Sequence, residues 1–164
     1  MNAPAVNAAA TTGAGTRPLL EVRDLRTHFA QSTGLFGRSH GVVRAVDGVS
    51  FDVFPGETLG IVGESGCGKT TLGRTILRLV EPTSGTIRFD GTDLLALKGS
   101  ALRAMRRHIQ IIFQDPFSSL NPRLTIGATI KEGITVHRLA EGAEADARVR
   151  RLLEEVGQIG RAHV

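Results

Sequence analysis

The sequence contains, at residues 63–71, the glycine-rich stretch Gly63-Glu64-Ser65-Gly66-Cys67-Gly68-Lys69-Thr70-Thr71. This stretch satisfies the phosphate-binding pattern G-x-x-x-x-G-K-[ST], which requires a strand before it and a helix after it. Before it, the short apolar run Thr58–Val62 is typical of a buried strand in a parallel sheet. After it, Lys69–Val80 carries apolar residues at helical spacing, and Pro82 and Gly85 mark its end. The order strand, loop and helix therefore agrees with the pattern.

The chemistry of the pattern assigns one task to each residue type. The glycines let the backbone amides of the loop point inward, and the positive end of the following helix adds to their attraction for anions. Lys69 is expected to reach the β- and γ-phosphates of a nucleotide, and the Thr70 hydroxyl to coordinate a Mg²⁺ ion that bridges them. Cys67 occupies a variable position, where a structural role and a redox role both remain open. The prediction is a site for a nucleoside triphosphate and Mg²⁺.

Composition limits the classes of protein to which the chain can belong. Of its 164 residues, 41% are hydrophobic and 22% charged, which excludes a wholly disordered or collagen-like chain. Every apolar run is too short for a membrane span, and the single cysteine excludes an internal disulfide. The net charge of +4 comes from scattered arginines without Trp or Tyr, so we expect a solvated surface and no nucleic-acid partner. Residues 1–17 lack the pattern of a secretory signal and are expected to form a disordered tail.

Further elements follow from local patterns along the chain. Val49, Phe51 and Val53 alternate with polar residues before a Pro-Gly turn, which indicates a half-buried antiparallel strand and a hairpin. Other strands are predicted at Leu19–Phe29, Thr86–Phe89 and Ile109–Phe113, with a loop at Gln31–Gly41. Helices are predicted at Leu94–Arg107, Ile126–Leu139 and Ala143–Val156. A sheet-based part thus passes into a helical part near Asn121.

Several motifs together resemble one family. They are residues 64–71, Pro82-Thr83-Ser84-Gly85 and Ile112-Phe113-Gln114-Asp115-Pro116, in that order. The chain from about Leu19 to Val156 resembles the ATP-binding subunits of ABC transporters. The continuation Phe117–Arg123, and Ala45–Ser50 earlier in the chain, are similar to the ATPases of oligopeptide and dipeptide importers. Leu72-Gly73-Arg74 favours the second of the two ATPases that such importers usually carry.

The resemblance implies an architecture. The fold class is α/β, a P-loop NTPase core of the RecA-like kind with an ABC-type antiparallel β-subdomain and the start of a helical subdomain. Residues 18–121 would form the ATP-binding core and β-subdomain, and residues 122–158 the start of the helical subdomain.

The full-length protein would bind Mg-ATP and couple its hydrolysis to peptide import. It would lie at the cytoplasmic face of the membrane and pair head-to-tail with a second ATPase subunit. Membrane permease subunits and, indirectly, a solute-binding protein would be its other partners.

The resemblance also assigns roles to single residues. Gln114 would be the Q-loop glutamine, which reaches Mg²⁺ and the attacking water; the alternative is an ordinary polar residue of a loop. Phe29 would stack on adenine, although Phe36 competes for this role and a plain core position is the alternative. Phe117–Arg123 would face a membrane subunit, or else form a surface turn. With Lys69 as the second catalytic residue and Thr70 as the second metal ligand, these residues complete the predicted site.

Parts of the family pattern are missing from the sequence. No Asp follows a run of apolar residues, because Gln114 separates Ile111-Ile112-Phe113 from Asp115, so the Walker B carboxylate has no counterpart. The signature motif and the switch histidine are also absent. We therefore expect a truncated member of the family. Two alternatives remain: a soluble ABC-type ATPase, and a non-catalytic nucleotide-binding fragment.

The last residues depart from the family pattern. Residues 159–164, Ile-Gly-Arg-Ala-His-Val, can be encoded by ATC GGA AGA GCA CAC GTC, which resembles a common sequencing adapter. We expect this end to be non-native, produced by read-through from a truncated DNA fragment. The alternative is a divergent turn of the natural protein.

Overall fold

A computed structural model describes residues 17–32, 40–115 and 120–158 of the chain. The predictions for residues 1–16 and 159–164, for Phe36 and for the first part of Phe117–Arg123 lie outside these ranges. The chain divides into two compact units between Leu102 and Arg103. The expected domain boundaries at 17/18, 121/122 and 158/159 remain predictions.

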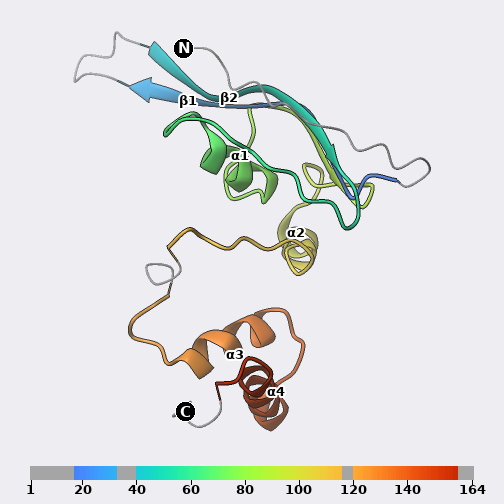
Figure 1. Cartoon of the computed structure of the whole chain (residues 1–164), viewed down its shortest axis with the longest axis vertical. Coiled ribbons are helices and arrows are strands. Elements are labelled where there is room, and N and C mark those ends of the chain that lie inside the picture. Colours follow the sequence, from blue (N-terminus) through green and yellow to red (C-terminus); the bar gives the residue numbers. More distant parts are fainter. Residues whose placement is uncertain (1–16, 33–39, 116–119, 159–164) are drawn as a thin grey trace. The chain divides into compact units, whose positions relative to one another are not determined.

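The first unit is built on a four-stranded antiparallel sheet (Figure 1). The strands are β1 (Leu20–Ser32), β2 (His40–Val53), β3 (Ser84–Phe89) and β4 (Thr92–Asp93), in the spatial order β2-β1-β3-β4. β1 is central to the unit because it pairs with β2 along its whole length and with β3 near its beginning. The half-buried strand that alternation predicted around Phe51 is therefore confirmed, but its partner is β1 and not the segment after the Pro-Gly turn.

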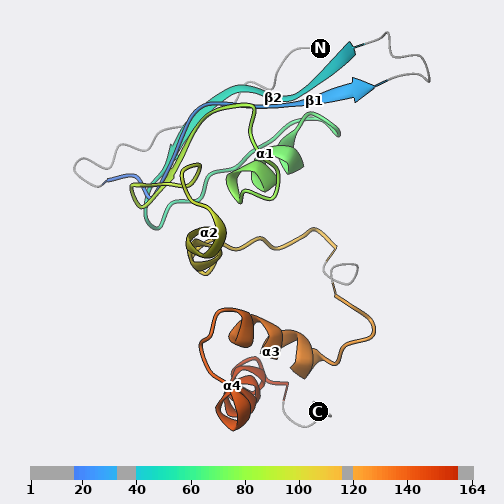
Figure 2. The same cartoon turned by 180° about the vertical axis from the view of Figure 1, so that it is seen from behind.

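The helix α1 (Lys69–Ile76) packs against one face of this sheet, as Figures 1 and 2 show from opposite sides. Its buried residues Leu72, Thr75 and Ile76 lie three and four positions apart, which places them on one side of the helix. The sheet contributes the buried apolar side chains Val22, Leu25, Val46, Val49, Phe51 and Ile87. The core of the first unit thus lies between β1–β3 and α1.

A close crossing fixes the start of β3 on β1. Gly85 has a φ of 105°, and a Cβ at this position would lie 2.6 Å from the carbonyl oxygen of Asp24 and from the Cα of Leu25. β1 itself is irregular here, since its register shifts between Val22 and Leu25. Only glycine allows β3 to approach this irregular part of β1 so closely.

Two predicted strands are wrong. Thr58–Val62 and Ile109–Phe113 have no regular secondary structure, and the side chains of Val62 and Ile112 are 83% and 92% exposed. A strand of a parallel sheet needs at least one neighbouring strand to pair with its backbone, and other elements to cover its apolar faces. Within the described residues, neither segment has such a neighbour. Their apolar sequence is therefore not sufficient to form the strands.

Two predicted helices of the first half are shorter than expected. α1 ends at Ile76 because Arg78 adopts a positive φ of 54°, which no α-helix continues. The helix predicted at Leu94–Arg107 begins later, as α2 (Gly99–Met105). Leu94 instead donates its amide to the carbonyl of Ile87 at 2.9 Å and is buried against the sheet. Leu94, which apolar spacing placed in the helix, thus belongs to the β3–β4 hairpin instead.

The second unit contains a pair of helices, α3 (Ile126–Val136) and α4 (Gly142–Glu155), close to the predicted ranges. Their shared core is small and consists of Ile134, Ala140, Ala145, Val149 and Leu153, with Ile130 packed against it. The Thr125 hydroxyl caps α3 by accepting from the amide of Ala128 at 3.1 Å. Lys131 and Asp146 join the two helices through an ion pair of 2.6 Å. None of the described helices has the length and apolar character that a transmembrane helix needs.

Candidate functional site

The glycine-rich loop precedes α1 directly, so the helix that the pattern requires is present, whereas the strand expected before the loop does not form in the described residues. α1 begins at Lys69, and Gly68 is its N-cap with φ 103° and ψ 1°. Because Gly68 offers no capping side chain, the first amides of α1 receive no side-chain hydrogen bond from the N-cap. Within the loop, the amide of Cys67 donates to the carbonyl of Glu64 at 3.3 Å. The arrangement places a helix N-terminus beside a compact glycine-rich turn.

Lys69 lies back across this loop. Its ammonium donates to the carbonyl oxygens of Gly63 and Glu64, both at 2.7 Å, and contacts the Cys67 sulfur at 3.5 Å. A Cβ at Gly63 would lie 2.6 Å from this sulfur, so the loop closes tightly around Cys67. The cation of the pattern is thus held within the loop by neutral oxygen acceptors.

An unexpected contact joins the loop to the sheet. β1 pairs Thr27 with Val46 and His28 with Arg44, so Ala45 is an extra residue in β2 and forms a bulge. The Ala45 carbonyl points at Gly68, where a Cβ would lie only 1.9 Å from its oxygen. The N-terminus of α1 therefore packs directly against β2 at this bulge.

Phe29 lies on β1, the strand that also carries the buried Thr27. It is two positions beyond the buried Thr27 on β1, so the pleat places both side chains on the same face of the sheet. Phe29 pairs with Val43, and both are 43% exposed. An exposed aromatic side chain therefore lies on the face that also carries α1. Its contact with adenine remains a prediction.

The other predicted residues are exposed or partly exposed. Thr70 is exposed in the first turn of α1, and Thr71 is partly buried beside it. Gln114 is exposed and belongs to the second unit, so its role as catalytic residue and metal ligand remains a prediction. In the described part of the chain, no three His, Cys, Asp or Glu residues gather into a metal site. A hydroxyl oxygen such as that of Thr70 suits Mg²⁺, which commonly completes its shell with phosphate oxygens and water.

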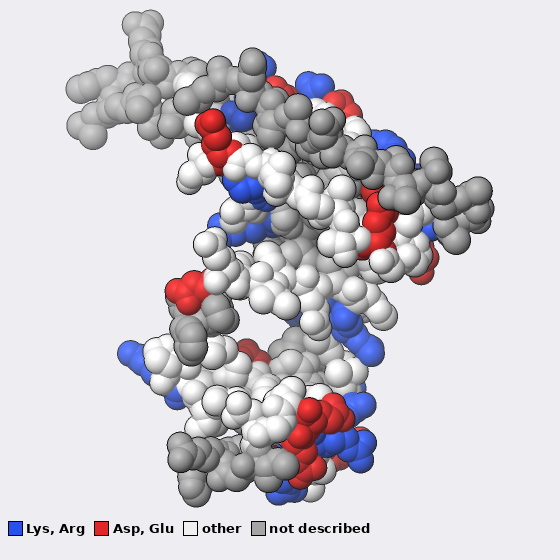
Figure 3. Space-filling view, in the orientation of Figure 1, with Lys and Arg blue, Asp and Glu red and all other residues white. Residues whose placement is uncertain are grey.

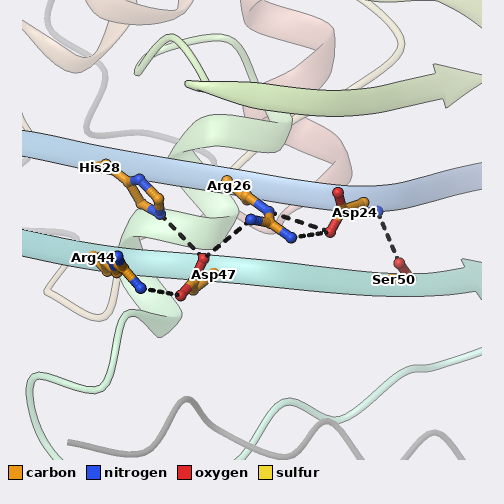
Figure 4. Close-up of polar contacts among 6 residues, drawn as sticks. All are labelled: Asp24, Arg26, His28, Arg44, Asp47 and Ser50. Carbon is orange, nitrogen blue, oxygen red and sulfur yellow. Dashed lines mark hydrogen bonds and ion pairs between the residues drawn. The ribbon is translucent and has the colours of Figure 1, made fainter.

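Charged residues form a separate cluster on β1 and β2 (Figure 4). Asp47 lies 3.2 Å from His28 Nε2, 3.6 Å from an Arg44 nitrogen and 3.9 Å from an Arg26 nitrogen. Arg26 also donates to the Asp24 carboxylate at 3.0 Å, and this hydrogen bond raises the pKa of Arg26. Arg26 and His28 alternate with Leu25 and Thr27, so the cluster lies on the face opposite α1.

One face of the described surface shows mixed charge. On the face drawn in Figure 3, Lys and Arg atoms lie among Asp and Glu atoms. The charges of the cluster around Asp47 are likewise matched with one another. The cluster includes none of the predicted site residues, so we assign it to holding β1 and β2 in register.

Sequence reasoning missed the Ala45 bulge and the support that β1 gives to α1. Alanine has no property that predicts a bulge at position 45. Thr27 carried a weak signal, because a polar residue interrupts the apolar positions Leu25 and Phe29 on one face of the strand.

Comparisons with known proteins agree with the geometry. Residues 46–164 match the family described as ABC transporter. The chain is 52% identical over 147 residues to the glutathione import ATP-binding protein GsiA of Pectobacterium atrosepticum, covering 90% of this chain and 24% of GsiA. It is 50% identical over 147 residues to the oligopeptide transport ATP-binding protein AppF of Bacillus subtilis, covering 89% of this chain and 45% of AppF. The chain thus spans less than half the length of these relatives.

Solved structures show the same fold. The dimeric structure of MJ0796, a bacterial ABC transporter cassette, superposes with a TM-score of 0.66 at 24% identity, over 87% of this chain and 58% of the cassette. A post-hydrolysis state of the same cassette, bound to ADP and Pi, gives a TM-score of 0.64 at 24% identity, over 82% of this chain and 56% of that one. The family match, covering well over half of the chain, establishes that the chain belongs to the ABC transporter family.

Proposed function

We propose that the chain binds ATP together with Mg²⁺ through residues 63–71, as part of the ATP-binding subunit of an importer for peptides. The observation that carries the proposal is the position of the Lys69 ammonium, which lies within the loop on the carbonyls of Gly63 and Glu64. An entering phosphate would compete with two neutral carbonyls for this cation, and an anionic oxygen forms the stronger hydrogen bond. Lys69 then neutralises the β- and γ-phosphates, while Thr70 supplies a hydroxyl to Mg²⁺.

The substrate class follows from the relatives. GsiA is named as an import protein for glutathione and AppF as a transport protein for oligopeptides, and both substrates are peptides. We propose that the whole protein couples ATP hydrolysis to import of a peptide. Its partners would be a second ATPase subunit, permease subunits in the membrane and a solute-binding protein, which would place it at the cytoplasmic face of the membrane. The dimer of the MJ0796 cassette supports the proposed pairing of ATPase subunits.

Phe29 and Gln114 complete the proposed site. Phe29 stacks on adenine, supported by its exposed position on the face of the sheet that carries α1. Gln114 orients Mg²⁺ and the attacking water, which rests on the motif Gln114-Asp115-Pro116 alone.

The test of nucleotide binding is Lys69→Ala, with Lys98→Ala as the matched control. Both variants remove one lysine charge, but Lys98 is an exposed residue that immediately precedes α2. Removing a charged hydrogen-bond donor from the phosphates should weaken binding of a fluorescent ATP analogue with Mg²⁺ by about ten- to a hundredfold. Lys98→Ala should bind like the unchanged chain. Equal affinities for Lys69→Ala and the control would refute the proposed phosphate site.

Catalysis is a separate matter, because the 164 residues contain no Walker B carboxylate, signature motif or switch histidine. These groups supply charge stabilisation and water positioning, and losing one such contribution lowers a rate by on the order of a hundred- to a thousandfold. The isolated chain should therefore bind nucleotide without turning it over. Phosphate release at a rate that Lys69→Ala abolishes would contradict this expectation.

A further inference from the structure

Two buried hydroxyl groups connect the sheet to α1. Within the described residues, Thr27 on β1 and Thr75 on α1 are the polar side chains that are buried, at 1% and 0% exposure. Their Oγ1 atoms lie 3.1 Å apart. The Thr75 hydroxyl also donates to the carbonyl of Thr71 at 2.8 Å. A continuous hydrogen-bond chain thus runs from β1 through Thr75 to the first turn of α1.

The chemistry of hydroxyl groups fixes the direction of this chain. Each threonine hydroxyl has one proton, and that of Thr75 is directed at Thr71. Thr27 must therefore donate its proton to the Thr75 oxygen. Because both side chains are buried, water cannot replace either partner, and the Thr27 proton depends on the Thr75 oxygen for its hydrogen bond, whereas Thr75 also donates to Thr71.

The end of this chain lies next to the proposed phosphate site. Thr71 follows Lys69 and Thr70 in the first turn of α1. Gly68, directly before this turn, packs closely against the Ala45 carbonyl of β2. The hydroxyl chain therefore adds a second point of attachment, to β1, and two attachments restrict rotation of the turn where one does not.

We propose that Thr27 is a positioning residue for the nucleotide site: its buried hydroxyl, acting through Thr75 and the Thr71 carbonyl, holds the first turn of α1 in the orientation that presents Lys69 and Thr70 to the phosphates. The inference rests on the proposed function, since it concerns the geometry of the same site. Thr27 touches no part of the nucleotide and acts only through Thr75.

The hydroxyl and the methyl of Thr27 have different tasks, and two substitutions separate them. Thr27→Val keeps the shape and the packing but removes the donor. Thr27→Ser keeps the donor but removes a buried methyl group, which should lower the unfolding midpoint in urea. Thr75→Val and Thr75→Ser repeat the comparison from the helix side, so that the test does not depend on one variant being folded.

The readouts are the affinity of each folded variant for a fluorescent ATP analogue with Mg²⁺, and the urea midpoint measured by circular dichroism. A single net hydrogen bond corresponds to roughly three- to tenfold in affinity, which sets the largest loss that Thr27→Val and Thr75→Val should show. Thr27→Ser and Thr75→Ser should bind like the unchanged chain in spite of lower midpoints. Affinity that follows the hydroxyl group, reduced in both Val variants and kept in both Ser variants whatever their urea midpoints, is a pattern that a purely structural role does not produce.

Other results would overturn the inference. If Thr27→Val and Thr75→Val bind normally while Lys69→Ala does not, the hydroxyl chain has no positioning role although the site is real. If affinity follows the urea midpoint in all four variants, the threonines act only through stability. If the unchanged chain itself fails to bind the analogue, the proposed function fails together with the inference that rests on it.

Discussion

Replacing Gly68 by alanine tests the contact between the β2 bulge and the loop. The added Cβ would lie 1.9 Å from the Ala45 oxygen, whereas real Cβ atoms essentially never approach another atom within 3.0 Å. Relieving this overlap requires the backbone to shift. Extra atoms forced into a well-packed core destabilise a protein by about 1–3 kcal/mol, and we expect a similar cost here. The φ of 103° adds about 1–2 kcal/mol for any residue with a side chain. We expect Gly68→Ala to lower the free energy of unfolding by about 2–5 kcal/mol.

Two neighbouring glycines provide matched controls. Gly66 also has a positive φ, of 80°, but a Cβ there would meet nothing within 4 Å, so alanine should cost only the backbone term of about 1–2 kcal/mol. Gly73 lies within α1 in open space, where alanine should stabilise by about 0.5–1 kcal/mol. The difference between Gly68→Ala and Gly66→Ala isolates the contact with Ala45.

The assay is urea unfolding followed by circular dichroism, with a common slope fitted to all variants. For a slope of about 1–3 kcal/mol per molar urea, the overlap of about 1–3 kcal/mol should separate the midpoints of Gly68→Ala and Gly66→Ala by roughly 0.3–3 M. The same proteins should be titrated with the fluorescent ATP analogue, because the displaced turn carries Lys69. Coincident unfolding curves for these two variants would show that Ala45 does not support the loop.

Three further predictions concern other parts of the chain. Gly85→Ala places a Cβ 2.6 Å from backbone atoms of Asp24 and Leu25 and should destabilise the first unit by about 2–5 kcal/mol. As a control, Gly56 has a φ of 77° and open space around it, so Gly56→Ala should destabilise the unit by only about 1–2 kcal/mol. Equal urea midpoints for the two variants would contradict the close crossing of β3 and β1. The Lys131–Asp146 pair is 40% and 44% exposed, so a double-mutant cycle should give about 0.2–1 kcal/mol, decreasing in 1 M salt; a larger, salt-independent coupling would be inconsistent with its exposure. In a longer protein carrying this sequence, Gln114→Ala should reduce turnover far more than nucleotide affinity, and equal losses would argue against its proposed role.

Elements that depend on local sequence could be predicted well. The start of α1 at Lys69 follows from the glycine-rich pattern, and β3 from its short apolar run between a glycine and an Asp-Gly turn. The ranges of α3 and α4 lie within three residues of those expected, because apolar residues spaced three and four positions apart are a local signal. The family, too, could be identified from short motifs in a fixed order.

Elements that depend on distant partners could not be predicted. Thr58–Val62 and Ile109–Phe113 have the composition of strands, but pairing with neighbours makes a strand, and composition does not show which neighbours are present. The bulge at Ala45 depends on the register between β1 and β2, which no single residue encodes. The partner of Thr27 lies 48 positions away, so their hydrogen bond could be found only in three dimensions.

The segment Ile109–Phe113, exposed from Gln110 onward, has a consequence for handling the protein. It is uncharged, contains no proline and is rich in β-branched and aromatic residues, the features of segments that stack into intermolecular β-structure. Arg106, Arg107 and His108 precede it, and Asp115 and Pro116 follow it, which is the flanking pattern that opposes such stacking. The arginines repel like copies at low ionic strength, and salt screens this repulsion. The purified chain should therefore remain dispersed longest in dilute, low-salt buffer, where light scattering can follow the onset of aggregation as salt is added.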